Sequence, residues 1–440
     1  MIVKSLMVLL GVQKLPDRAQ DLVKKYVFTL MFIDFFALLS STFYVLFVID
    51  TVGYAQLGVL LAVRFLLQAV LDYPSGALGD WIGQRWVLFI AFLSYGLSYT
   101  LLIWAESFSR LLIVYLLFGF AASQESGAWT AWFDNNYKIA VDDADPQRGI
   151  YKLMMGRWRM VVNFTGAVAF LVGGFASTYY VVRQTVFAVQ AFVMFIVAFL
   201  LLFVIKDFAE VERPKKTLQN YLRLLGEGIK IVALERGLLF LMAGICCYGI
   251  VWAVWAEMIL FPMYYGYTGD DAGASALRFV AWVITIPTLY FAANLGARLS
   301  IKWYPRIYLL FSILFFGSFM LLTAWIPPED RFNPVAFVFI IIILGSILLL
   351  FYIGEILDRR IFLDLIPDRN RSSIYSLRPT LVLISRAPGV IIGGLFLKEL
   401  GMPLTIGILG LLGIVGTAFF YIAMQFLAVD QLEDKARMIS

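Results

Sequence analysis

The chain has 440 residues, of which 62% are hydrophobic and 15% are charged, and its net charge is +5. Soluble domains carry about 25% charged residues, so a soluble fold could not cover this much apolar surface. The chain has no histidine, which excludes a Ser-His-Asp triad, a histidine-ligated haem and a histidine-containing zinc site. We expect no cofactor, no metal ion and no enzymatic centre, and the positive charge requires no nucleic acid as a partner.

Twelve apolar runs follow one another along the chain. Each is long enough for a helix that crosses a bilayer, which needs roughly 20 apolar residues. They are too long for the ~10-residue strands of a membrane barrel, so we expect an all-α, polytopic membrane protein with 12 transmembrane helices. The shorter apolar stretch 2–12 should lie at the membrane surface. The expected spans are residues 25–50, 57–78, 86–105, 111–133, 151–175, 184–205, 238–263, 275–297, 307–326, 334–357, 373–397 and 403–429.

Lys and Arg residues are concentrated in every second loop, as they are in the cytoplasmic loops of membrane proteins. If the N-terminus is cytoplasmic, the inside segments hold most of them, and the densest group lies between residues 206 and 236. We therefore expect a multi-pass protein of the cytoplasmic (inner) membrane with both termini in the cytoplasm. The expected outside loops hold only Arg110, Arg183, Arg331 and Lys398.

The polar segment 206–236 follows the sixth apolar run and divides the twelve runs into two sets of six. We expect residues 1–205 to form an N-terminal six-helix bundle and residues 237–440 to form a C-terminal one. Residues 206–236 should be a cytoplasmic linker with an amphipathic helix. A weak repeat relates the halves, because Gly173-Gly174 in the fifth run is echoed by Gly393-Gly394 in the eleventh.

The turn between the second and third runs carries several glycines, one acid and one base. We expect the helix to leave the membrane at Leu78, to turn tightly through glycines and to re-enter at Trp86. Asp80 and Arg85 would then be exposed at the cytoplasmic rim. The segment reads Gly76-Ala77-Leu78-Gly79-Asp80-Trp81-Ile82-Gly83-Gln84-Arg85.

This segment resembles the Gly-x-Leu-x-Asp-x-x-Gly-x-Arg signature loop of the major facilitator superfamily. Three other segments resemble motifs of one prokaryotic branch of that family, at the ends of helices 2 and 4 and at the entry to helix 11. They are Asp72-Tyr73-Pro74-Ser75-Gly76-Ala77-Leu78-Gly79-Asp80, Ser126-Gly127-Ala128 followed by Trp132-Phe133-Asp134, and Ile366-Pro367-Asp368-Arg369-Asn370-Arg371-Ser372-Ser373.

The resemblance implies a fold of two six-helix bundles and transport of a substrate by alternating access. It also implies that Asp80 contacts the start of helix 11, where a helix N-terminus favours an anion, and so holds the outward-facing state together. We expect Asp134, at the same rim, to pair with Arg85.

Charged residues within the spans are expensive, costing at least about 2.5–3.5 kcal/mol on insertion scales, so they usually face a cavity or a partner. Asp34 and Glu125 each lie eight residues from the inner end of their runs, and Arg159 lies at a similar level. At ~1.5 Å per residue, this layer is roughly 12 Å deep. Arg159 shares a helix face with Asn163. Two carboxylates and one arginine in a layer suit proton binding and release, although static helix packing is an alternative.

Four other charges within the spans are candidates. Arg386 lies near mid-depth, where we expect it to bind an anion or a carboxylate. Arg64, in the outer half of the second run, is a further candidate for the cavity. Glu257 and Arg278 lie near the expected outer ends of runs seven and eight. We expect them to form an ion pair or a gate contact, and residues that merely reach water are the alternative.

We therefore expect a secondary active transporter that moves a small organic solute, is coupled to protons and acts as a monomer in the lipid bilayer. Efflux is one alternative, and the sequence leaves the direction of transport open. The family resemblance departs at Ile113-Val114-Tyr115-Leu116, where many proton-driven members carry an arginine. An uncoupled facilitator is therefore an alternative. A membrane-embedded enzyme and a transport-dead receptor are alternatives of another class.

Overall fold

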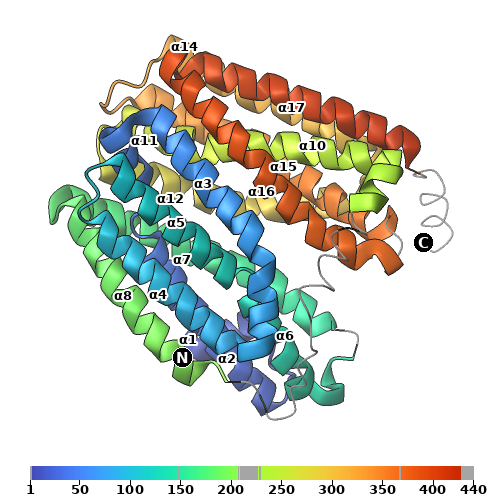
Figure 1. Ribbon diagram of the computed structural model, residues 1–440. Coiled ribbons are helices and arrows are strands. Elements are labelled where there is room, and N and C mark those ends of the chain that lie inside the picture. The colour runs from blue at the N-terminus through green and yellow to red at the C-terminus, as the bar shows by residue number, and fades with distance from the viewer. Residues whose placement is uncertain are drawn as a thin grey trace. The chain divides into compact units, whose positions relative to one another are not determined.

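The computed structural model describes residues 2–146, 148–206, 208, 226, 229–365 and 368–427, without the side chains of residues 2–4, 73–77, 80–81, 159, 297, 363–365 and 368–376. Every regular element in these ranges is a helix (Figure 1). The chain divides into two compact units, Met1–Tyr44 with Val70–Thr217 and Val45–Ala69 with Leu218–Ser440. The amphipathic helix expected within residues 206–236 falls largely outside the described residues.

The first unit contains one short helix, the helices at the positions of the first and the third to sixth expected spans, and only the last part of the second span, from residue 70. The N-terminal stretch forms a helix that packs on α7, with the buried side chains of Met7 and Leu10. The elements are α1 (Ile2–Leu10), α2 (Asp17–Leu38), part of α3 (Tyr44–Ile82), α4 (Gln84–Leu102), α5 (Phe108–Glu125), α6 (Ala128–Val141), η1 (Asp142–Ala144), α7 (Gly149–Tyr179) and α8 (Arg183–Val204).

The second unit contains the helices at the positions of the last six expected spans, together with residues 45–69 of α3. Two of these spans are interrupted by π-helical turns, η2 and η4, without ending there. The elements are α10 (Arg236–Val254), η2 (Trp255–Ile259), α11 (Leu260–Thr268), α12 (Asp271–Arg298), η3 (Ile301–Trp303), α13 (Tyr304–Phe311), η4 (Ser312–Phe316), α14 (Gly317–Trp325), α15 (Pro334–Leu365), α16 (Asp368–Glu399) and α17 (Gly401–Phe426).

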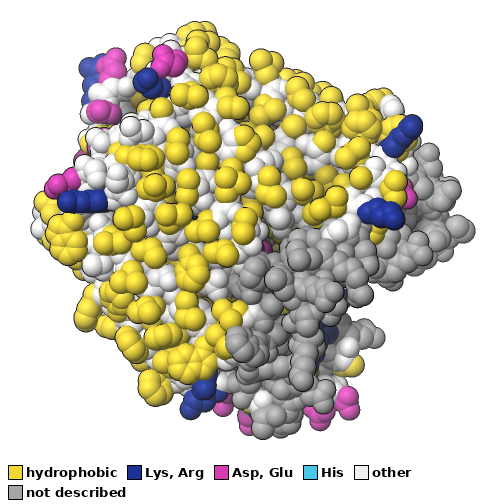
Figure 2. Space-filling model, in the orientation of Figure 1, with side chains coloured by type: hydrophobic (Ala, Val, Ile, Leu, Met, Phe, Trp, Pro, Cys, Tyr) yellow, Lys and Arg dark blue, Asp and Glu magenta, His cyan; other side chains and the backbone are white. Residues whose placement is uncertain are grey.

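Within the described residues, 11 helical segments are long and apolar enough to cross a membrane. The helix α2 is not among them, because it carries too many charged residues: Asp17, Arg18, Asp21, Lys24, Lys25 and Asp34. In Figure 2, hydrophobic side chains cover most of the visible surface, and charged side chains gather at its edges. On α8, large exposed apolar side chains recur at helical spacing, as a lipid-facing helix requires. They are Val189, Phe192, Ile196, Phe199 and Phe203.

The first expected span is not one continuous helix, because α2 ends at Leu38 and α3 begins at Tyr44. The break exposes carbonyl groups at the end of α2. The fully buried Gln190 of α8 donates from its amide to the carbonyl oxygens of Phe36, at 2.8 Å, and Ala37, at 3.1 Å. A broken helix is tolerated at membrane depth only where such partners satisfy its backbone. A buried polar residue in span six therefore compensates a break in span one.

The same pairs of spans pack in both units. In the first unit, α4 packs against α5 and α8, and α2 packs against α7. In the second unit, α13 packs against α15 and α17, and α10 packs against α16. The repeated glycines lie at equivalent contacts. A Cβ at Gly173 of α7 would collide with the carbonyl oxygen of Leu39, and a Cβ at Gly393 of α16 would lie 2.6 Å from the side chain of Val254. The weak sequence repeat thus has a structural counterpart.

Residues 45–69 of α3 pack closely on α16 within the second unit, and Figure 1 shows the two helices side by side. A Cβ at Gly58 would collide with the carbonyl oxygen of Val390, and a Cβ at Gly394 would lie 2.5 Å from the carbonyl oxygen of Tyr54. Glycines at both positions therefore let the two backbones approach each other closely.

Candidate functional site

The structure brings Asp34 of α2 and Glu125 of α5 close enough to interact electrostatically within the first unit. The carboxylate of Glu125 accepts hydrogen bonds from the Tyr95 hydroxyl, at 2.9 Å, and from the Trp129 indole N–H, at 3.3 Å. Among the described side chains, neither carboxylate forms an ion pair. The side chain of Arg159, which the sequence placed in the same layer, lies outside the described residues, and Asn163 is half-buried on α7.

Glu125 owes its position to a break in the fourth expected span. The helix α5 ends at Glu125, and α6 begins at Ala128 after Gly127, whose φ of +75° is one that L side chains rarely adopt. The expected span 111–133 lies within the apolar segment Phe108–Ala144, but two helices form it, with a turn at Ser126 and Gly127. Trp129, in the first turn of α6, reaches back across this break to Glu125.

The glycine turn of the signature loop lies at Gly83. The helix α3 continues past Leu78 to Ile82, and Gly83, whose φ is +96°, separates it from α4. A Cβ at Gly79 would lie 2.4 Å from the amide end of the Gln84 side chain, which would have to move. The exposed guanidinium of Arg85 lies over the ring of Trp86, at 5.5 Å. The side chain of Asp80, like those of the residues around Gly76, lies outside the described residues.

Asp134 does not pair with Arg85. Its carboxylate forms an ion pair with Arg148, at the start of α7, and a longer one with Lys138, at 3.5 Å. Lys138 is one helical turn after Asp134 on α6, and Arg148 lies just beyond the following loop, so both partners are local in sequence. The Arg148 guanidinium also lies over the ring of Tyr151, at 4.1 Å.

Asp145, in the loop before α7, satisfies the first turn of that helix. It accepts hydrogen bonds from the backbone N–H groups of Ile150 and Tyr151, at 3.1 and 2.9 Å, and from the Tyr137 hydroxyl, at 3.0 Å. Burial opposes the charged form, but these hydrogen bonds outweigh it and lower the pKa of Asp145 below its ordinary value. Asp145 therefore stays ionised and caps α7.

In the second unit, a basic cluster surrounds one carboxylate. Glu257 lies in the π-helical turn η2, and its carboxylate pairs with Arg64 of α3, 4.0 Å away. The expected ion pair between Glu257 and Arg278 is wrong. The buried guanidinium of Arg278 instead lies over the ring of Phe261, at 4.2 Å, and interacts with Glu257 only at longer range.

Arg386 of α16 completes the basic cluster. Its guanidinium lies 5.7 Å from the centre of the Phe65 ring and interacts electrostatically with both Glu257 and Arg64. Its buried Nε atom has no hydrogen-bond partner among the described residues. The helix α16 continues through Pro388 without ending.

Glu257 lies further from the end of its span than the sequence placed it. Span seven continues through η2 and α11 to Thr268, 11 residues past Glu257, whereas the sequence ended this span at residue 263. At ~1.5 Å per residue, Glu257 is roughly 16 Å from the outer end of its span, and Arg386 is roughly 20 Å from the end of α16 at Glu399. Both residues therefore lie well inside helical segments that are long and apolar enough to cross a membrane.

Sequence reasoning missed Asp358 on α15. This carboxylate is buried, with its side chain 8% exposed, and it pairs with Arg378 of α16 at 2.5 Å. The Tyr304 hydroxyl donates to its other oxygen at 3.1 Å. Asp358 lies one residue beyond the expected span 334–357, so nothing in the hydropathy pattern marked it as a buried acid.

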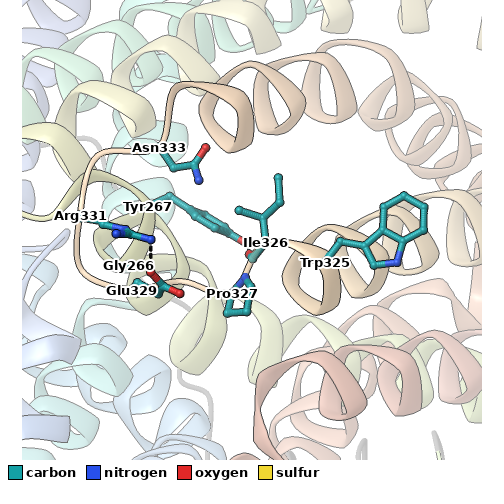
Figure 3. A pocket seen from close by; sticks show the side chains of 8 residues that line it. All are labelled: Gly266, Tyr267, Trp325, Ile326, Pro327, Glu329, Arg331 and Asn333. Atoms are coloured by element: carbon teal, nitrogen blue, oxygen red, sulfur yellow. Dashed lines mark hydrogen bonds and ion pairs between the residues drawn. The ribbon is translucent and has the colours of Figure 1, made fainter.

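A pocket of about 210 Å³ lies at one end of the second unit, between α11 and the loop that joins α14 to α15 (Figure 3). The loop is attached to α11 by the Tyr267 hydroxyl, which donates to the carbonyl oxygen of Ile326 at 2.5 Å. Glu329 and Arg331 form an ion pair at its rim. The pocket contains none of the residues that the sequence proposed for a substrate or proton site, and its Arg331 was expected only as an outside-loop residue.

Comparisons with known proteins agree with this architecture. A family model described as Major Facilitator Superfamily matches residues 27–356, which is 330 of the 440 residues. The comparison with curated proteins gives no match.

Three solved structures are similar in fold. The nucleoside transporter NupG is 13% identical with a TM-score of 0.66, over 91% of this chain and 98% of that one. A bacterial homologue of the human lysosomal transporter Spinster, in an inward-facing and unoccupied conformation, is 15% identical with a TM-score of 0.65, over 93% and 98%. An auto-inhibited peptide transporter of the POT family is 12% identical with a TM-score of 0.67, over 93% and 96%.

Proposed function

This chain is a member of the major facilitator superfamily, and from that membership we propose a secondary transporter that carries a small organic solute across the cytoplasmic membrane, by alternating access and coupled to protons. The family and fold indicate a multi-pass membrane transporter rather than an enzyme. In the proposal both termini are cytoplasmic, the chain acts as a monomer, and residues 1–205 and 237–440 form the two bundles.

The observation that carries proton coupling is the proximity of Asp34 and Glu125. Two carboxylates that share a membrane layer cannot both ionise without placing like charges together in a medium of low dielectric constant. One proton shared by the pair relieves that repulsion, and the pair titrates as a unit. Tyr95 and Trp129 donate hydrogen bonds to Glu125 and hold it in place. In the proposal, Arg159 and Asn163 complete this site from α7.

The test uses proteoliposomes that contain a pH-sensitive dye and are supplied with candidate solutes across an imposed pH gradient. Asp34→Asn and Glu125→Gln should abolish solute accumulation, because neither variant retains two carboxylates that can share a proton. Exchange of solute across the membrane needs no net proton movement and should survive in at least one variant. Asp21→Asn is the matched control, since Asp21 is an exposed carboxylate on the same helix that pairs with Lys24 at 2.8 Å.

Two outcomes would contradict this proposal in different ways. Loss of both exchange and accumulation in both variants would make Asp34 and Glu125 substrate ligands or structural residues. Full gradient-driven accumulation in both variants would remove any coupling role and would favour the uncoupled facilitator.

A further inference from the structure

The basic cluster of the second unit places three arginines beside one acid. Among the described residues, the guanidinium groups of Arg64, Arg278 and Arg386 interact with Glu257, and Arg386 forms no ion pair there. Arginines within membrane spans are usually kept because they contact a ligand or line an aqueous path. The side chains of Arg64 and Glu257 are 29% and 41% exposed, so a solute can reach this pair.

Aromatic rings orient two of the three guanidinium groups. Arg278 lies over Phe261 at 4.2 Å and over Trp282 at 5.7 Å, and Arg386 lies over Phe65 at 5.7 Å. Stacking on a ring fixes the plane of a guanidinium and leaves its edge free to donate hydrogen bonds. A fixed guanidinium edge matches the two oxygens of a carboxylate, and the rings can contact an apolar body attached to it.

We infer that the transported solute is a small organic anion, whose carboxylate binds Arg386 and displaces Glu257 from Arg64. This inference rests on the transport function proposed above and names its substrate class. Glu257 is then an internal counter-ion, which balances Arg64 when the site is empty and competes with the solute for it. The 4.0 Å separation of the Arg64 and Glu257 charged groups is longer than a direct hydrogen-bonded ion pair, so the contact can be exchanged for a closer one.

Binding can be tested on the full chain in detergent, with acids and their neutral amides as probes: benzoate against benzamide, and succinate against succinamide. A ligand that binds the folded state raises the thermal unfolding midpoint. We expect at least one acid, but not its amide, to raise it. Arg386→Gln should abolish the response, whereas Arg306→Gln, which alters an exposed arginine stacked on Trp303, should preserve it.

Glu257→Gln gives the response that separates a counter-ion from a structural residue. Because the competing carboxylate is removed, this variant should respond to the acid at a concentration lower by roughly 5-fold or more, the usual range for coupled equilibria. If Arg386→Gln does not fold, Arg386→Lys replaces it. Lysine keeps the charge but not the planar edge, so this variant should respond more weakly than the unaltered chain and should still distinguish acid from amide.

The inference is overturned if amides stabilise the chain as well as acids do, or if no acid has an effect. Loss of the acid response in Glu257→Gln also overturns it, because the cluster would then be one structural network. Stabilisation only by phosphatidylglycerol, abolished in Arg386→Gln, would assign the cluster to a lipid headgroup instead of a solute. Binding without any flux would leave this inference standing and refute the transport proposal. Proton-coupled flux that does not discriminate between acid and amide would support the transport proposal and refute this inference.

Discussion

In the first unit two carboxylates, Asp34 and Glu125, lie near each other among hydroxyl and indole donors, whereas in the second unit three guanidinium groups surround Glu257. The frames that carry them are alike, because the same pairs of spans pack in both units. The repeated packing therefore fixes where helices meet and leaves the sign of the buried charge open. A duplicated frame can thus hold an acidic site in one half and a basic site in the other.

The largest expected effect is a difference in stability between variants of Arg378, which forms a buried ion pair, and of Arg386, which belongs to the basic cluster. Arg378→Gln would leave the Asp358 carboxylate buried without its cation, so we expect a loss of about 3–5 kcal/mol in the free energy of unfolding. Arg386→Gln should cause no comparable loss, since Arg386 forms no ion pair among the described residues. Denaturant titration of both variants measures the difference. Equal losses would make Arg386 a structural residue and would break the comparison.

A smaller effect should come from the glycines that hold the paired helices together. Gly173→Ala would force a Cβ against the backbone oxygen of Leu39, and Gly393→Ala would force one against Val254, so each should cost about 1–3 kcal/mol through overpacking. Gly156→Ala, on the same helix as Gly173, meets nothing within 4 Å and should be neutral or stabilising by roughly 0.5–1 kcal/mol. Thermal unfolding of the three variants checks the order. If neither Gly173→Ala nor Gly393→Ala lowered the stability, close packing at these glycines would not be what holds the paired helices together.

The smallest effect concerns an acid of the first unit that stays ionised. Asp145→Ala removes the capping hydrogen bonds at the start of α7 and should cost about 0.5–2 kcal/mol. The pKa of Asp145 is lowered in the folded chain, so its contribution is complete above the ordinary value of about 3.9 and is lost as pH falls through the folded value. Unfolding midpoints of Asp145→Ala and the unaltered chain should therefore converge at acidic pH. A constant difference down to that range would contradict the assignment.

The sequence was sufficient to predict the family and the positions of the spans, because hydropathy over about 20 residues is a bulk property that survives local irregularity. It did not reveal the breaks between Leu38 and Tyr44 or after Glu125. The side chains that form hydrogen bonds with residues at these breaks come from other helices. Gln190 and Trp129 are examples, and neither is recognisable from its own neighbours in the chain.

Partners of charged residues were the least predictable part of the candidate site. Asp134 binds Arg148 instead of Arg85, and Glu257 binds Arg64 instead of Arg278. The choice of partner depends on helix rotation and depth, and an error of one residue turns a side chain by about 100°. The predicted distance of Glu257 from the outer end of its span was also wrong, because that span continues five residues beyond its expected end, to Thr268.

The π-helical turn at Trp255–Ile259 has a consequence for how this chain tolerates changes in length. Its hydrogen bond from the N–H of Leu260 to the carbonyl oxygen of Trp255 spans five residues, one more than an α-turn requires. Deleting a single residue here would close the turn into an ordinary α-helix, whereas a deletion elsewhere in the span would shift every later side chain to a new face. The turn is thus a natural position for insertions and deletions, and one at which a change in chain length would move Glu257 relative to Arg64 while both helices remain intact.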